Sequence, residues 1–129
     1  MQFWTEKTAI DDPSETQLRE ALLSENFSNG CIAQLEATSK DYLHTMAFNR
    51  PTGGLGFYIE RRGPSPDDWF AGVTPGRAKV IISKPWWMFW VADIETHLFD
   101  LDEMVAIFCQ HLRGETHYDW VRIPPSYED

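Results

Sequence analysis

Carboxylates are concentrated in one short segment of this chain, at Asp93, Glu95, Asp100, Asp102 and Glu103. Carboxylates that converge in a cleft can exchange protons with a substrate or hold Mg²⁺. Asp100 and Glu103 have the spacing of a helix capping box, and Asp102 would stabilise the positive start of that helix. We therefore expect structural use for these three, and we take Asp93 and Glu95 as candidates for binding.

The other residues capable of chemistry form no recognisable site. The histidines and cysteines lack the spacing of metal ligands or of a redox pair, although His111 and His117 could pair in space. No phosphate-binding loop, nucleophile elbow or calcium loop is present. We therefore expect no enzymatic activity, no metal and no cofactor. The residues in question are His44, His97, His111, His117, Cys31 and Cys109.

Tryptophan is abundant, with six residues, and residues 85–91 contain a dense group of aromatic side chains. Strand alternation would place Trp86 and Trp90 on one face and Trp87 on the other. Such a strand is either central and covered on both faces, or it displays aromatic side chains to a partner.

A second aromatic group, Trp69 and Phe70, follows Asp67 and Asp68 in residues 62–76, which are rich in Pro and Gly and predict a long loop. This group either folds back on the protein or contacts a partner, and we favour contact.

The net charge of −9 comes from the two ends of the chain. Residues 1–25 carry −4, residues 26–92 carry +2 and residues 93–129 carry −7. An acidic chain is poorly suited to binding phosphate backbones or anionic lipid, so we expect neither nucleic acid nor membrane as a partner. The acidity serves solubility or attracts a basic protein.

A first helix is predicted after Asp12, which would cap it, with Pro13 in the first turn and Glu15 completing a capping box. Residues 28–30 are expected to end it. Alternating side chains then predict strands at residues 31–36, 42–48 and 55–61, joined by short turns as in an antiparallel meander. Further strands are predicted at residues 79–83, 86–99 and 117–123.

The second helix has the clearest boundaries in the sequence. Asp100 is its predicted cap, Phe99 can pack on Met104 as a hydrophobic staple, and Gly114 ends the helix. Its apolar residues recur at helical spacing and predict one buried stripe. We expect a single α+β domain, residues 1–129, with an antiparallel sheet of about five to six strands and two helices on one face. The stripe comprises Leu101, Met104, Val105, Phe108, Cys109 and Leu112.

The order of elements, together with the helix of residues 101–112, the Arg113-Gly114 stop and Trp120 in the final strand, resembles an immunity-protein family of bacterial polymorphic-toxin systems. Members of such families are cytosolic antitoxins that neutralise one cognate toxin, often by covering its active site. The resemblance implies a binding protein and assigns no residue a role.

Our leading hypothesis is an immunity protein that covers the basic cleft of a cognate toxin with an acidic, aromatic surface. We expect it to be cytoplasmic, because residues 1–7 do not resemble a signal peptide, and monomeric or weakly dimeric. The alternative is a small ligand-binding domain or enzyme with a pocket lined by Trp86 and Trp90. The predicted partner-binding residues are Asp67, Asp68, Trp69, Trp87, Asp93 and Glu95.

Overall fold

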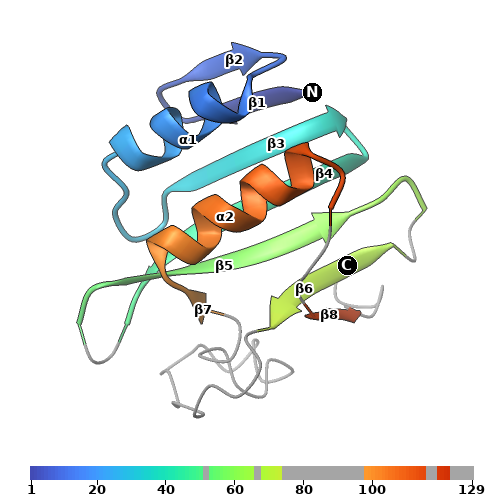
Figure 1. Ribbon diagram of the computed structural model, residues 1–129. Coiled ribbons are helices and arrows are strands. Elements are labelled where there is room, and N and C mark those ends of the chain that lie inside the picture. Colours follow the sequence, from blue (N-terminus) through green and yellow to red (C-terminus); the bar gives the residue numbers. More distant parts are fainter. Residues whose placement is uncertain (51–52, 66–67, 74–97, 116–118, 123–129) are drawn as a thin grey trace.

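The computed structural model describes residues 1–50, 53–65, 68–73, 98–115 and 119–122 (Figure 1). These ranges hold two helices and eight strands. In chain order they are β1 (Gln2–Thr5), β2 (Ala9–Asp11), α1 (Glu15–Ser24), β3 (Ile32–Thr38), β4 (Asp41–Asn49), β5 (Leu55–Arg62), β6 (Trp69–Val73), β7 (Leu98–Phe99), α2 (Leu101–Leu112) and β8 (Asp119–Arg122).

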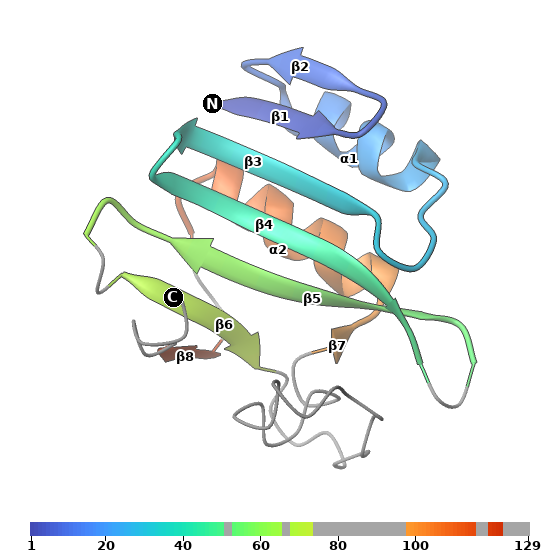
Figure 2. The same cartoon turned by 180° about the vertical axis from the view of Figure 1, so that it is seen from behind.

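The eight described strands join one antiparallel sheet in the order β2-β1-β3-β4-β5-β6-β8, and β7 pairs with β5. Both helices lie on the same face of this sheet, as Figure 1 and the view from behind in Figure 2 show. The predicted α+β class and the one-sided placement of the helices are confirmed. Neither β1 nor β2 was predicted, so the sheet extends further at its N-terminal edge than expected.

The start of α1 differs from the prediction. Ser14 caps the helix: its Oγ accepts a hydrogen bond from the Gln17 N–H at 3.1 Å, and Gln17 Oε1 accepts one from the Ser14 N–H at 2.8 Å. Asp12 instead has a φ of 47° and binds the Met1 ammonium group at 2.7 Å. The cap moves because β2 runs to Asp11, so that Asp12 and the proline after it serve as the turn from strand to helix.

The end of α1 also comes earlier than expected, at Ser24, with Glu25 in an extended conformation as the C-cap. Gly30 has a φ of 90° and forms the turn into β3, where its N–H donates to the Ala47 carbonyl at 2.8 Å. The glycine therefore serves the strand that follows rather than the helix.

The boundaries of α2 are as predicted. Asp100 is the N-cap, and its N–H donates to Glu103 Oε1 at 2.9 Å. The Asp100 carboxylate also binds the mostly buried Arg50 guanidinium at 2.9 Å, which ties the start of the helix to the end of β4. Gly114 follows the helix with a φ of 78°. This left-handed conformation is unfavourable for residues that have a Cβ, and glycine adopts it readily.

The hydrophobic core lies between the helices and the sheet. Helix α1 contributes Leu18 and Leu22, and the predicted stripe of α2 is buried along most of its length. The alternation of β3, β4 and β5 turns every second side chain into this layer, as the strand pattern predicts. From the sheet the core receives Phe3, Ala33, Leu35, Leu43, Ala47, Phe57, Ile59 and Phe99.

The segment predicted as the longest loop is shorter in the structure. Trp69 is the first residue of β6 and pairs with Arg62 on the adjacent strand β5. The prediction that Trp69 lies at a loop tip is therefore wrong. Aromatic residues favour strands, and here that preference prevails over the neighbouring Pro and Gly. The predicted strand at residues 79–83 lies outside the described residues, as do residues 86–97 of the strand predicted at 86–99, whose last two residues form β7. Neither of the two described helices has the length and apolar character needed to cross a bilayer.

Candidate functional site

Two of the predicted binding residues, Asp68 and Trp69, belong to the described part of the chain. Asp67, Trp87, Asp93 and Glu95 lie outside it, as do Trp86 and Trp90 of the alternative pocket hypothesis. Asp68 forms a tight turn: its N–H donates to the Ser65 carbonyl at 2.9 Å and its carbonyl accepts from the Gly63 N–H at 2.7 Å. A Cβ at Gly63 would lie 2.7 Å from the Asp68 Cβ, so this turn requires glycine.

Trp69 lies on the sheet face that points away from the helices. We call this surface the helix-free face, because neither described helix covers it (Figure 2). Its members alternate along the strands with the core residues and pair in register across β1, β3, β4, β5 and β6. All are half-buried, which leaves part of each side chain accessible. They are Trp4, Ile32, Gln34, Glu36, Tyr42, His44, Met46, Phe48, Tyr58, Glu60, Arg62 and Trp69.

A chain of hydrogen bonds crosses this face from Glu36 to His44. The Gln34 Nε2 donates to Glu36 Oε2 at 2.9 Å, and the Gln34 Oε1 lies 3.0 Å from His44 Nδ1. A carboxylate only accepts, so the Gln34 amide nitrogen must face Glu36 and its oxygen must accept from His44. Burial lowers the pKa of His44 and favours its neutral form. The proton of the neutral ring is therefore on Nδ1, and Nε2 carries a lone pair.

Glu60 is the second centre of the helix-free face. Its carboxylate accepts hydrogen bonds from the Trp69 indole N–H, at 3.2 Å, and from the Tyr58 hydroxyl. The Arg62 guanidinium carbon lies 5.7 Å from the centre of the Trp69 ring, a cation–π contact. Burial raises the pKa of Glu60, and the hydrogen bonds and Arg62 oppose that rise. Burial beside Glu60 also raises the pKa of the Tyr58 hydroxyl.

Strand register brings these two centres together. Gln34 is opposite His44, and His44 is opposite Glu60, so the three residues form one row across β3, β4 and β5. Trp4 of β1 extends the row on the far side of Gln34. Directly opposed residues of antiparallel strands have Cβ atoms about 4.5–5.5 Å apart. The row is therefore a continuous polar strip flanked by aromatic side chains.

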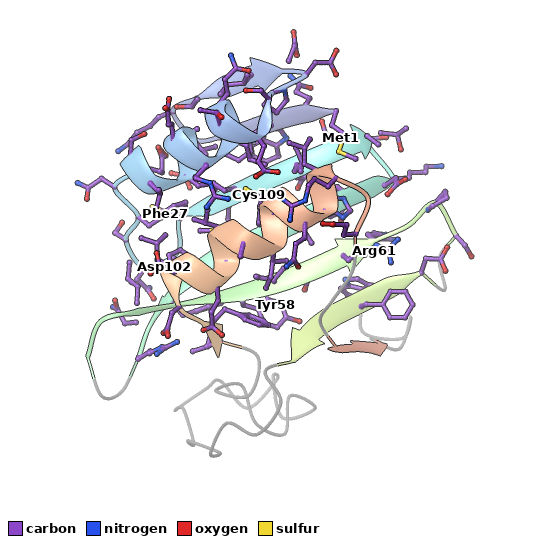
Figure 3. The ribbon with its side chains drawn as sticks, in the orientation of Figure 1. Met1, Phe27, Tyr58, Arg61, Asp102 and Cys109 are labelled. Carbon is purple, nitrogen blue, oxygen red and sulfur yellow. The ribbon has the colours of Figure 1, made fainter. Side chains whose placement is uncertain are left out.

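The helical layer is acidic, in contrast to this face. Arg113 at the end of α2 binds Glu15 at the start of α1, and it also binds Glu115 at 2.7 Å. Arg19 lies 3.6 Å from Glu15. Figure 3 shows Cys109 on the side of α2 that faces α1, and Asp102 near the N-terminal end of α2. The other acidic side chains of this layer are Glu20, Glu25, Asp100, Asp102 and Glu103.

Sequence reasoning did not identify the members of this row as a site. The alternation of residues 31–36 and 42–48 already placed Gln34 and His44 on one face of their strands. The missing information was the register that sets them beside Glu60, which depends on contacts between strands. Within the described ranges, no three His, Cys, Asp or Glu side chains gather in a way that could hold a metal ion.

Comparison of the chain with protein-family models, with curated proteins and with solved structures found no match.

Proposed function

We propose that this protein is an immunity protein that binds and neutralises a cognate secreted toxin, and that the helix-free face is its docking surface. The observation that carries this proposal is the set of half-buried aromatic side chains, among them Trp4, Tyr42 and Trp69, on a sheet face that the described helices leave uncovered. Tryptophan and tyrosine are the residues most enriched at the energetic centres of protein interfaces.

Electrostatics support a basic partner. The chain carries a net charge of −9, and acidic side chains are concentrated on the helical layer. The helix-free face itself adds the carboxylates of Glu36 and Glu60, so negative charge is also present where the partner would dock. Its aromatic side chains supply the contacts that hold the complex together. We propose a toxin with a basic active-site cleft, met in the cytoplasm by a monomer or weak dimer of this chain.

The proposal is tested by co-producing the chain with the toxic domain encoded by the neighbouring gene and measuring growth. Tyr42→Ala and Trp4→Ala are expected to reduce protection and to weaken binding at least tenfold, about 1.4 kcal/mol. Leu23→Ala, on α1, is the matched control because Leu23 is 49% exposed on the opposite side of the sheet. If both face variants remain folded and protect as well as the wild-type chain, the helix-free face is not the docking surface.

A further inference from the structure

The polar strip on the helix-free face has a defined hydrogen-bond polarity. One N–H of the Gln34 amide, the His44 Nδ1–H, the Trp69 indole N–H and the Tyr58 hydroxyl each donate to an acceptor in the strip or beside it on the same face. His44 Nε2 meets no partner among the described residues. A carboxylate has about four acceptor positions, so Glu60 retains capacity after its two hydrogen bonds. The strip therefore presents acceptors to an incoming group.

Two of the acceptors on this face, His44 Nε2 and the Glu60 carboxylate, belong to neighbouring strands. His44 and Glu60 are directly opposed in the β4–β5 register. A planar guanidinium group presents several N–H donors in a fixed fork and also stacks on aromatic rings, whereas an ammonium group is a compact point charge. Tyr42, whose ring centre lies 6.5 Å from that of His44, supplies an aromatic neighbour. The face already holds one guanidinium in this manner, that of Arg62 over Trp69.

We infer that the strip formed by Gln34, His44 and Glu60 is a binding site for an arginine side chain, which donates to His44 Nε2 and to the Glu60 carboxylate. The guanidinium site rests on the contacts above. Its assignment to an arginine of the toxin rests on the proposed function.

The experiment titrates the full chain with three blocked pentapeptides that differ only at the central residue of Gly-Gly-X-Gly-Gly. That residue is arginine, its neutral isostere citrulline, or lysine. NMR follows the His44 ring nitrogens and the Trp69 indole N–H. The arginine peptide is expected to shift both resonances saturably and to bind at least tenfold more tightly than the citrulline peptide, with lysine in between.

Two variants locate the site. Glu60→Gln and His44→Phe are each expected to weaken the arginine peptide about tenfold, whereas Glu20→Gln, which removes the same charge from exposed Glu20 on α1, leaves its affinity unchanged. Should a variant fail to fold, the peptide comparison on the wild-type chain decides. Equal binding of arginine and citrulline peptides, or an equal loss in Glu20→Gln and Glu60→Gln, would overturn the inference.

The two proposals fail separately. If the arginine peptide does not bind but Tyr42→Ala still abolishes protection from the toxin, the arginine site is wrong and the docking face stands. If the peptide binds at the strip and protection is insensitive to the face variants, the site stands and its assignment to a toxin arginine is wrong.

Discussion

The contribution of α1 to the hydrophobic core can be measured with two leucines of that helix. Leu18 is fully buried, whereas Leu23, on the same helix, is 49% exposed. Replacing Leu18 with alanine removes about three buried carbon groups at about 0.8 kcal/mol each and leaves a cavity. We expect Leu18→Ala to lower the free energy of unfolding by about 3 kcal/mol. Leu23→Ala should change it by less than about 0.5 kcal/mol, because its side chain keeps much of its contact with water.

The assay is urea unfolding followed by far-UV circular dichroism, with the two variants and the wild-type chain fitted to a common slope. For a chain of 129 residues, a loss of about 3 kcal/mol corresponds to a fall in Tm of about 10 °C. The reasoning is refuted if the two variants lose equal stability, or if Leu18→Ala costs less than about 1 kcal/mol. Either result would mean that the apolar face of α1 is not buried in the core as described.

Three further predictions concern a cap, a turn and a buried carboxylate. Ser14→Ala should cost about 1 kcal/mol in thermal unfolding because it removes the α1 cap, and a smaller loss than for Asp12→Ala would contradict the assigned cap. Gly114→Ala should cost about 1 kcal/mol by the same measurement, because the φ of 78° strains any residue with a Cβ; an unchanged Tm would argue against that conformation. Burial raises the pKa of Glu60 above its ordinary 4.5, so the folded state binds the proton more tightly than the unfolded state does. Its contribution to stability therefore falls as pH rises from about 4.5 through the folded-state pKa. Glu60→Gln should remove that fall. In urea unfolding, the free energy of unfolding of the variant minus that of the wild-type chain should therefore be larger at pH 7.5 than at pH 4. The same difference at both pH values would contradict a raised pKa of Glu60.

Local signals predicted the elements whose determinants are local. The spacing of apolar residues in 101–112 and the pair Asp100 and Glu103 sufficed to place α2, because a helix is specified by neighbours three and four residues apart. The cap of α1 was misplaced because Asp12 and Ser14 are both good capping residues. The pairing of β2 with β1, a contact between segments, decides between them.

The site was less predictable than the fold. The sequence predicts Trp69 as a contact residue from its neighbours, but its position on the sheet depends on the pairing of β6 with β5. The row that contains His44 and Glu60 exists only once β4 and β5 are in register, since a shift by one residue would turn one of the two side chains into the core. Residues far apart in sequence therefore define the site, and each alone resembles an ordinary surface residue.

The position of α2 in the chain has a consequence for synthesis on the ribosome. The strands that α2 covers, β4 and β5, emerge well before residues 101–112. Until then Leu43, Phe57 and Ile59 face outward from a sheet that α1 covers only in part. A nascent or truncated chain that stops before Leu101 therefore carries an open apolar surface, the condition that favours self-association and chaperone binding. Synthesis of residues 101–112 supplies the helix that covers this part of the sheet.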